Sequence, residues 1–493
     1  MAGGRERGPL QVGRHQQSRG KAAPQLGDHR VEVTAMARTG APRIDDVPMN
    51  HFLRKIIVFS SGGAFLDGYV LSIIGVALVQ ATIQLHLSDF QVAATGAAAL
   101  AGIFFGSLAG GYFTDRFGRR VMFIIDISAI GLASALALVI DAGWQLLVLR
   151  LLLGFFIGAD YPIATSLIAE FTPISHRSVG MGLVAGAWYL GATVAAFIGW
   201  LLYDVTRGWR WMLASAVIPC VGLLVGRHDI PESPRWLAQR GQLHQAHEVA
   251  VQVFGADVNL DDEQSPDRRG LGTILRGGYL VRVLYLGVLV LCQVVPMYAI
   301  YTFGPRIMGA LGLEHGRSGV LGEAVVSFLF LVGTYPAIKW LDSIGRRPLL
   351  IGSLGMMTVG LMVLGIWAHA PILVVLLGFG TYAFFSGGPG ILQWLYPNEL
   401  FPTEVRATAV GIAIAISRIG VVFSTYGLPL FLQRWGIGPT MCVGAGLLLL
   451  ALVLSLGLAP ETRGRPLEQT SSLDHPTRPS PTGTSPMEGK HHG

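Results

Sequence analysis

The sequence predicts an all-α integral membrane protein, with twelve transmembrane helices that form two pseudo-symmetric six-helix bundles. This prediction depends on the composition of the chain, on the number of apolar segments and on motifs that occur twice. Hydrophobic residues make up 52% of the 493 residues and charged residues 13%, whereas a soluble domain carries roughly 25% charged residues. The low fraction of charged residues indicates that most of the chain lies within a bilayer.

Twelve apolar segments have the length needed to span a membrane, which is about 20 residues for a helix. Small residues such as Gly154 and Gly158, four apart, let membrane helices approach closely. In chain order, the expected spans are 56–80, 90–112, 121–140, 144–171, 180–203, 211–227, 281–305, 318–338, 348–368, 371–396, 406–432 and 438–459.

The segments outside the spans divide the chain. Residues 1–50 are polar and rich in arginine, so we expect a disordered cytoplasmic tail, and residues 460–493 are expected to form a second cytoplasmic tail. Between them we expect an N-terminal six-helix bundle at 51–227, a cytoplasmic central loop at 228–280 and a C-terminal six-helix bundle at 281–459.

The placement of lysine and arginine predicts the orientation, because cytoplasmic loops carry an excess of both. With both termini in the cytoplasm, most of the 36 Lys and Arg residues fall on the cytoplasmic side. Only Arg207, Arg210, Arg306, Arg317 and Arg434 then fall outside. We therefore expect a multi-pass protein of the cell (inner) membrane, and the net charge of +6 reflects this orientation and does not indicate nucleic-acid binding.

Three motifs occur once in each half of the chain. DRFGRR at Asp115–Arg120 returns as DSIGRR at Asp342–Arg347, and EFTPISHRSVGMG from Glu170 returns as ELFPTEVRATAVG from Glu399. PESPRWL after the sixth span returns as PETRGRPLE after the twelfth. The second copies follow the first at nearly the same distance, which indicates a duplication of six spans that can rock about a central site.

These motifs resemble those of the major facilitator superfamily, and within it the sugar porters and related metabolite:H+ symporters. GGYFTDRFGRR, PESPRWL, YPNELFPTEVRATA and PETRGRPLE look like sugar-porter signatures, whereas FLDGYVLSIIG, GADYPIATSLIAEFTP and SRIG look more like those of organic-acid symporters. The resemblance covers residues 55–469. It implies a secondary active transporter that takes up a small polar organic solute, an organic acid or a sugar, together with H+.

The charged residues of the repeated motifs are the candidates for a cytoplasmic gate. In the family that the chain resembles, acid–guanidinium pairs of this kind latch the cytoplasmic side and separate when the halves rock. The alternative is topogenic charge with surface pairs worth about 0–1 kcal/mol each. The candidate gate residues are Asp115, Arg119, Arg120, Glu170, Arg177, Asp342, Arg346, Arg347, Glu399 and Arg406.

Ionisable side chains within spans mark the expected proton pathway. Asp67 and Asp160 lie about 16 Å and 15 Å from the cytoplasmic face at the helical rise per residue, so both are expected near the midplane. A protonated acid bonded to a neighbouring helix is the alternative. Arg150, near the outer end of the fourth span, resembles the partner of the acid in helix 1 of sugar porters, or snorkels to the interface. Related symporters often carry DGYD where this chain has DGYV, with Val70 at the second acid.

Arg418 is expected about 18 Å deep in the eleventh span, at the helical rise per residue. A permanent cation at that depth needs an anion, which is either a helix acid such as Asp160 or Glu323 or the solute itself. Organic-acid symporters of the superfamily place a cation there, so the resemblance favours an anionic solute.

The remaining substrate-binding candidates are aromatic and amide side chains, which suit a small polar organic solute. Helix packing is the alternative for each aromatic ring. The candidates are Gln293, Tyr298 and Tyr301 in the seventh span, Trp188 in the fifth, and Gln393 and Trp394 in the tenth.

Other function classes lack their motifs in this sequence. There is no G-x-S-x-G, H-E-x-x-H, Walker-type loop or Cys/His cluster, so we expect no enzyme, no cofactor and no metal site. A channel would lack the duplication with paired loop motifs. A drug or metabolite:H+ antiporter on the same fold and an inorganic phosphate symporter remain alternatives. The expected partners are the solute, H+ and the lipid bilayer, without nucleic acid, and the expected functional unit is a monomer.

Overall fold

The structure is a computed structural model that describes residues 48–171, 177–255, 279–311, 317–401 and 403–463. The side chains of residues 161–170, 177–179 and 403–408, and those of Gly111, Asp115, Met181, Arg235, Gln239 and Asn398, lie outside the description. All described residues belong to one compact unit, 42–493. Their secondary structure is helical, and no strand occurs among them.

Twelve helical spans in the described residues are long and apolar enough to cross a membrane, which confirms the predicted number. Two of these spans are interrupted, the sixth between α7 and α8 and the tenth between α15 and α16. The first six spans are α2 (His51–Gln84), α3 (Asp89–Phe117), α4 (Arg119–Leu136) with the short 3-10 helix η2 (Ala137–Val139), α5 (Gly143–Phe171), α6 (Arg177–Leu201), and α7 (Gly208–Ala214) with α8 (Val217–Arg227). The second six are α12 (Leu280–Ala310), α13 (Arg317–Ser343), α14 (Arg346–Ile366), α15 (Ile372–Phe385) with α16 (Gly387–Leu400), α17 (Thr403–Trp435) and α18 (Ile437–Leu458).

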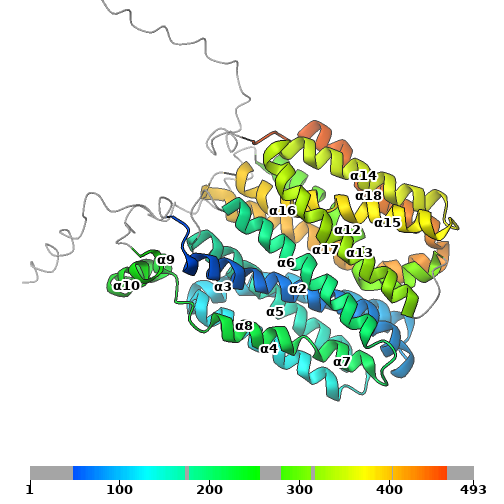
Figure 1. The fold of residues 1–493 in the computed structure, drawn as a ribbon, viewed down its shortest axis with the longest axis horizontal. Coiled ribbons are helices and arrows are strands. Elements are labelled where there is room, and N and C mark those ends of the chain that lie inside the picture. The colour runs from blue at the N-terminus through cyan, green and yellow to red at the C-terminus, as the bar shows by residue number, and fades with distance from the viewer. Residues whose placement is uncertain (1–47, 172–176, 256–278, 312–316, 402, 464–493) are drawn as a thin grey trace, which may run out of the picture. The chain divides into compact units, whose positions relative to one another are not determined.

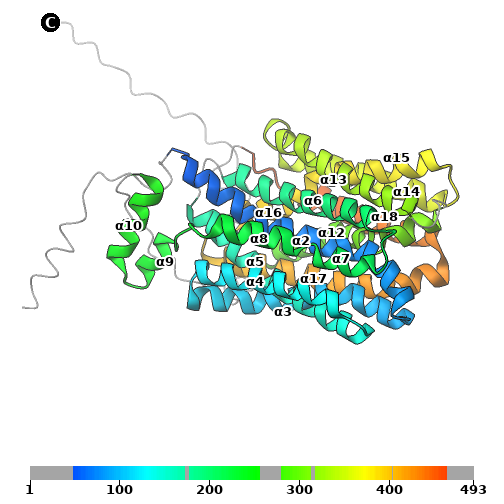
Figure 2. The same cartoon turned by 60° about the horizontal axis from the view of Figure 1, so that its bottom comes forward.

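The helices form two bundles that lie side by side (Figures 1 and 2). Helices α2 to α8 make the first half and α12 to α18 the second, and the halves meet where α6 packs on α13, α3 on α17 and α2 on α12. Two short helices in the predicted central loop, α9 (Pro234–Gln239) and α10 (Leu243–Phe254), lie at one end of the first half. We call the end that carries Asp115–Arg120 and Asp342–Arg347 the motif end, and the other end, with Asp204 and Arg317, the opposite end.

Small residues bring helices of the first half into backbone contact. A Cβ added at Gly154 of α5 would lie 1.9 Å from the carbonyl oxygen of Ala99 on α3, and one at Gly158 would lie 2.4 Å from that of Ile103. Neither distance is possible for a real Cβ. The sequence therefore needs glycine at both positions for α3 and α5 to pack this closely.

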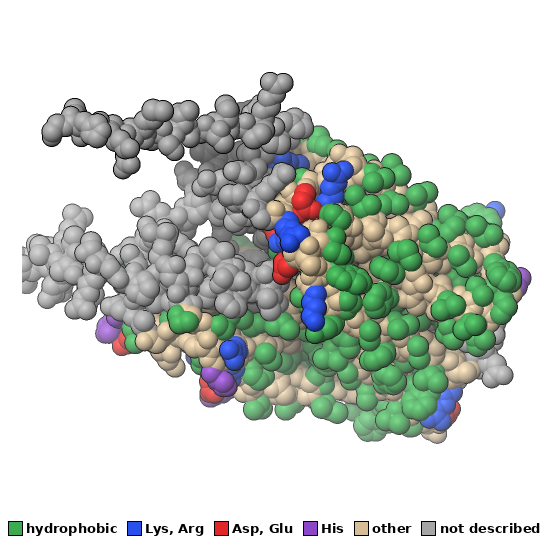
Figure 3. Space-filling view, turned by 45° about the horizontal axis from the view of Figure 1, so that its top comes forward, with side chains coloured by type: hydrophobic (Ala, Val, Ile, Leu, Met, Phe, Trp, Pro, Cys, Tyr) green, Lys and Arg blue, Asp and Glu red, His purple; other side chains and the backbone are tan. Residues whose placement is uncertain are grey.

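The outer surface of the bundles is apolar. Figure 3 shows one face on which hydrophobic side chains predominate, while charged side chains gather toward its ends. Val359 of α14, Leu377 of α15 and Val453 of α18 are each more than half exposed. Exposed apolar surface of this extent is typical of contact with lipid.

Candidate functional site

A cavity between the halves brings together several of the predicted substrate-binding residues. Side chains of α6, α12, α16 and α17 line it, and its empty space is about 670 Å³ including the mouth. The predicted residues in its lining are Trp188, Tyr298, Gln393, Trp394 and Arg418.

Arg418 supplies positive charge to this cavity. Its side chain is 7% exposed, and its Nη1 donates a hydrogen bond of 2.9 Å to the Tyr298 hydroxyl oxygen. The guanidinium carbon also lies 5.5 Å from the centre of the Tyr298 ring, within the range of a cation–π contact. Among the described side chains that line the cavity, Arg418 is the only charged one. The cavity can therefore attract and orient a negatively charged group.

Asp67 lies behind an aromatic wall of the cavity. The side chain is 3% exposed, and the indole Nε1 of Trp188 donates a 2.8 Å hydrogen bond to its Oδ2. The Trp188 ring meets the Tyr298 ring edge-on at 6.1 Å, and Tyr298 in turn accepts the hydrogen bond from Arg418. A line of contacts thus runs from the acid on α2 through both rings to the cation on α17. A change of charge at Asp67 therefore alters the hydrogen bond to Trp188, whose side chain lines the cavity.

Two predicted substrate-binding residues lie outside the cavity lining in this structure. Gln293 is buried, and neither atom of its amide has a hydrogen-bond partner among the described residues. Tyr301 is also buried, and its ring packs 5.1 Å from Trp188 and 5.2 Å from Phe330. In this state Tyr301 supports the wall of the cavity from behind.

Asp160 lies in a buried cluster of charges within the first half. Its carboxyl group interacts with Asp126 of α4, and both acids face the guanidinium of Arg227 at the end of α8. Arg227 also donates to the carbonyl oxygen of Phe59 from Nε and Nη2, at 3.0 Å and 2.7 Å. From the sequence, the depth of Asp160 was matched with that of Asp67, and neither Asp126 nor Arg227 was placed beside it. The side chain of Asp160 lies against α2 at Gly63, one helical turn before Asp67.

The side chain of Arg150 reaches α2, where it binds the backbone of the helix and not a side chain. The side chain is 1% exposed, and its Nη1 donates to the carbonyl oxygen of Val70 at 2.8 Å. Val70 occupies the position at which related symporters carry the second acid of DGYD. The expected partnership of Arg150 with Asp67 is therefore not formed here, because a main-chain carbonyl at Val70 accepts the hydrogen bond.

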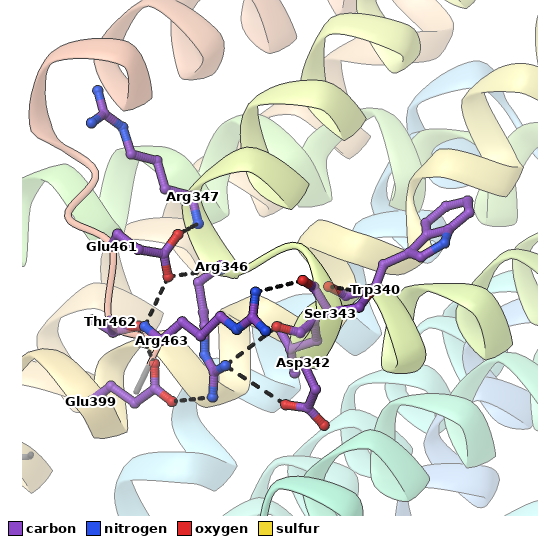
Figure 4. Close-up of polar contacts among 10 residues, drawn as sticks. Trp340, Asp342, Ser343, Arg346, Arg347, Glu399, Glu461, Thr462 and Arg463 are labelled. Carbon is purple, nitrogen blue, oxygen red and sulfur yellow. Dashed lines mark hydrogen bonds and ion pairs between the residues drawn. The ribbon is translucent and has the colours of Figure 1, made fainter. Parts of the chain in front are cut away.

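The predicted gate residues of the second half form a network at the motif end (Figure 4). Arg346 pairs with Glu399 at 3.1 Å and with Asp342 at 3.7 Å, and Glu399 also accepts a hydrogen bond from Thr462. These contacts join the end of α13 and the start of α14 to the end of α16 and to the segment after α18. All of them lie within one half. They hold the helix ends of that half together in this state, and none of them links the two halves.

Two further acids, which were not among the predicted site residues, cap the start of a helix, one in each half. Glu232 accepts hydrogen bonds from the backbone N–H groups of Arg119 and Arg120 at 3.0 Å and 3.1 Å. Glu461 accepts from those of Arg346 and Arg347 at 3.1 Å and 3.0 Å. Both acids belong to the third repeated motif, so the spacing of the repeat could have identified them.

The glycine of each D-x-x-G-R-R motif makes these caps possible. Gly118 and Gly345 adopt φ values of +100° and +108°, which side chains other than glycine rarely tolerate. A Cβ at Gly118 would lie 2.4 Å from Glu232 Oε2, and one at Gly345 would lie 2.8 Å from Glu461 Oε2. The same local geometry in both halves supports the duplication predicted from the sequence.

Glu461 remains ionised at its cap. Partial burial raises the pKa of its carboxyl group, but hydrogen bonds from the backbone N–H groups of Arg463, Arg346 and Arg347 lower it more. The pKa therefore lies below the usual value for glutamate. A carboxylate at the first turn of α14 also interacts favourably with the positive end of the helix dipole.

Glu461→Gln should loosen the start of α14. A neutral amide keeps the shape but loses charge-assisted hydrogen bonds, which are worth about 1.5–3 kcal/mol in other proteins. We expect the backbone amides of Arg346 and Arg347 to exchange with deuterium roughly tenfold faster. The matched control is Glu232→Gln, which should accelerate exchange at Arg119 and Arg120 instead. Equal exchange at the start of α14 in Glu461→Gln and wild type would contradict the assignment.

Four predicted gate residues cannot be placed in this network. The side chains of Asp115, Glu170, Arg177 and Arg406 lie outside the described residues. Arg119 is buried, and Arg120 donates from Nη2 to the carbonyl oxygen of His228 at 3.1 Å.

The two halves are in contact at the opposite end. Arg317 of α13 pairs with Asp204 at 3.0 Å and lies 4.5 Å from the ring centre of Trp200. Deeper between the halves, the Thr193 hydroxyl donates to the carbonyl oxygen of Ser327 at 3.0 Å. These contacts close the opposite end of the central cavity in this state.

Gly75 permits a close approach of the backbones of the two halves. Pro305 has no N–H group to donate to the carbonyl oxygen of Tyr301, and α12 departs from helical geometry at Phe303. A Cβ at Gly75 of α2 would lie 2.6 Å from that carbonyl oxygen. Only glycine therefore fits at this position while the opposite end is closed.

Gly75→Ala is expected to hold the opposite end open. The added methyl group meets backbone, which a rotamer change cannot relieve, and overpacking of this kind costs about 1–3 kcal/mol. Closure should become roughly 5- to 150-fold less favourable, with a matching loss of transport. Gly222→Ala is the control, because a Cβ there meets nothing within 4 Å. The check is cross-linking across the opposite end, and unchanged yields in Gly75→Ala would contradict the expectation.

The chain is similar to known transporters along most of its length. The family model for sugar (and other) transporters matches residues 55–473. YaaU of Escherichia coli K12, whose name describes a metabolite transport protein, is 49% identical over 87% of this chain and 97% of its own length. The arabinose-proton symporter of Bacillus subtilis 168 is 25% identical over 87% of this chain and 97% of its own length.

Solved structures share the fold. A structure of XylE, a proton:xylose symporter of the major facilitator superfamily from E. coli, aligns with a TM-score of 0.71. The alignment covers 85% of this chain and 98% of that one, at 23% identity. The likeness confirms the predicted fold class, two six-helix bundles with the major facilitator arrangement.

Proposed function

This chain belongs to the sugar (and other) transporter family, and we propose that it is a proton-coupled symporter for a small organic solute that carries a carboxylate. It is a multi-pass membrane transporter and not an enzyme. The solute class and the coupling ion are the proposed part. Arg418, the charged side chain of the central cavity, carries the proposal for the solute.

The surroundings of Arg418 suit a carboxylate. Its hydrogen-bond partner Tyr298 has a neutral side chain. A guanidinium offers two parallel N–H donors to a carboxylate, while Trp188, Trp394 and Gln393 provide ring faces and an amide for the rest of the solute. A sugar acid or a hydroxylated organic acid fits these groups.

Asp67 is the proposed site of the symported proton. The acid is buried beside the cavity and hydrogen-bonded to Trp188, and an ionisable side chain within a span generally marks a transport pathway. Proton loss would charge Asp67 and strengthen its bond to the indole N–H. The contact of Trp188 with Tyr298, which accepts a hydrogen bond from Arg418, would couple this change to the solute. Asp160 and Arg150, with their partners in the first half, are proposed to support α2 in this role.

The orientation follows from the same proposal. We place the motif end in the cytoplasm, with both termini, and the opposite end outside the cell membrane. The structure then corresponds to a state closed to the outside. The halves 51–227 and 281–459 rock as units about the cavity, linked by the 228–280 loop, and the repeated motif residues, including Asp115, Glu170, Arg177 and Arg406, form the cytoplasmic gate. A monomer contains the complete cavity.

Uptake into proteoliposomes with an imposed pH gradient tests the proposal. A panel should pair each carboxylate solute with a neutral analogue, such as a sugar acid and its parent sugar. We expect a carboxylate to accumulate when the outside is acidic and to stop accumulating when a protonophore removes the gradient. Accumulation driven by an acidic interior would indicate an antiporter. Accumulation of inorganic phosphate alone would indicate a phosphate symporter.

A further inference from the structure

Glu323 is a buried carboxylic acid that the proposed transport cycle does not use. It lies on α13 six residues after Arg317, about 9 Å from the opposite end at the helical rise per residue. Its side chain is 0% exposed. Neither carboxyl oxygen has a hydrogen-bond partner among the described residues. The residue also lies outside the lining of the central cavity.

Glu323 lies at the contact between the two halves. A Cβ added at Gly75 of α2 would lie 3.1 Å from its Oε1, and one at Gly304 of α12 would lie 2.8 Å from its Cδ. Glycine on two neighbouring helices thus leaves just enough room for this carboxyl group. In this state α2 of the first half covers Glu323.

No charged group among the described residues interacts with this carboxyl group. The titratable group that faces it is the Tyr301 phenol of α12, which is itself buried. On α2, Gly75 faces it and carries no charge, and on α13 the uncharged Ser327 lies one turn away. From α6, Thr193 donates to the carbonyl oxygen of Ser327 and carries no charge. Nothing in the described surroundings would stabilise a negative charge on Glu323.

An ionised carboxylate without a partner is strongly disfavoured in such an interface, whereas the neutral acid is tolerated. When the halves separate at the opposite end, α2 moves off Glu323 and water can stabilise its ionised form. We propose that Glu323 is a proton-binding site, and that the opposite end closes only when this site holds a proton. The proposal rests on the transporter function above and deepens it by assigning a regulatory proton.

The proton on Glu323 is distinct from the one that Asp67 carries. In the closed state Glu323 is fully buried and lies outside the lining of the cavity, so we assign its proton no passage to the motif end. It binds and leaves on the same side. Glu323 therefore sets the pH dependence of closure without adding to the number of protons transported. Acid at the opposite end favours closure, and alkali favours opening.

Distances across the opposite end test this proposal without solute or transport. Spin labels at cysteines replacing Ile83 of α2 and Ile366 of α14 report the separation of the halves, since both positions are exposed, at 70% and 78%. Cys442, the partly exposed native cysteine, is replaced by serine. The full chain in nanodiscs is measured over a range of pH. We expect the distance in the parent protein to lengthen as pH rises.

Neutral substitutions should remove this response. Glu323→Gln and Glu323→Leu are expected to keep the short distance at every pH, and either variant suffices if the other folds poorly. Glu323→Asp should retain a response to pH. The matched control is Glu248→Gln, an exposed acid on α10, which should respond like the parent.

Two results would overturn the proposal. One is a parent protein whose distance does not change with pH, and the other is a Glu323→Gln variant that follows the parent's pH curve. Uptake assays address the transport function separately. Failed proton-coupled uptake with an intact Glu323 response would reject only the proposed symport.

Discussion

Arg418→Gln should lose uptake of carboxylate solutes by roughly 30-fold or more. Removing one partner of a buried, hydrogen-bonded charge pair costs about 2–5 kcal/mol, and each 1.4 kcal/mol corresponds to about tenfold in affinity. Glutamine retains a hydrogen-bond donor toward Tyr298 but provides neither the charge nor the paired N–H groups of the guanidinium. Any uptake of a neutral analogue should change much less. Uptake of both solutes at matched concentrations, in proteoliposomes, measures the difference.

Two further variants refine this expectation. Arg418→Lys keeps the charge but not the planar pair of donors, so an intermediate loss is expected. Arg434→Gln removes an exposed arginine near the opposite end of the same helix and should leave uptake unchanged. If the protein carries only a neutral sugar, and this uptake survives Arg418→Gln, the assignment of a carboxylate is wrong.

Asp67→Asn should abolish concentrative uptake while exchange of solute continues. Asparagine has nearly the shape of aspartate, and its side-chain oxygen can still accept the hydrogen bond from Trp188. The amide cannot bind and release a proton. The accumulation ratio under an imposed pH gradient should therefore fall to unity, whereas exchange of labelled for unlabelled solute should persist.

The control for this variant is Asp141→Asn. Asp141 lies in the loop before α5, and its side chain is 81% exposed, so accumulation should match the wild type. Undiminished accumulation by Asp67→Asn with acid outside would show that the proton is carried elsewhere. Asp160 and its partner Asp126 would then be the next residues to test.

The sequence alone predicted the fold because its main signals are local. Span length, the lack of charge and the doubled motifs identified twelve helices in two halves, and the structure differs mainly at helix ends. For example, α2 extends to His51 because Asn50 caps it, its side chain accepting a hydrogen bond from the Leu53 N–H. The breaks in the sixth and tenth spans depend on local turns that apolar length does not reveal.

The depth of each residue along its span, read from the sequence, also identified part of the candidate site. Trp188, Tyr298, Trp394 and Arg418 were singled out by depth and by resemblance, and all four line the cavity. Depth does not show which neighbouring helix a side chain faces. For that reason Asp160 was matched with Asp67, although Asp160 faces Asp126 and Arg227.

Backbone partners and isolated side chains were not accessible from the sequence either. The bond from Arg150 to the Val70 carbonyl uses an acceptor that every residue has, so no residue type indicates it. Glu323 was considered only as a partner for Arg418. Its isolation between Gly75 and Gly304 depends on how the two halves pack, which motifs and periodicity do not determine.

Proton movement driven by the solute tests the central claim most directly. Proteoliposomes in weak buffer, without any imposed gradient, are followed with a pH electrode while a transported carboxylate is added outside. A symporter carries H+ inward with the solute, so the medium should become more alkaline, and a protonophore should abolish the change. Uptake of the solute without any pH change, or with acidification of the medium, would contradict proton-coupled symport.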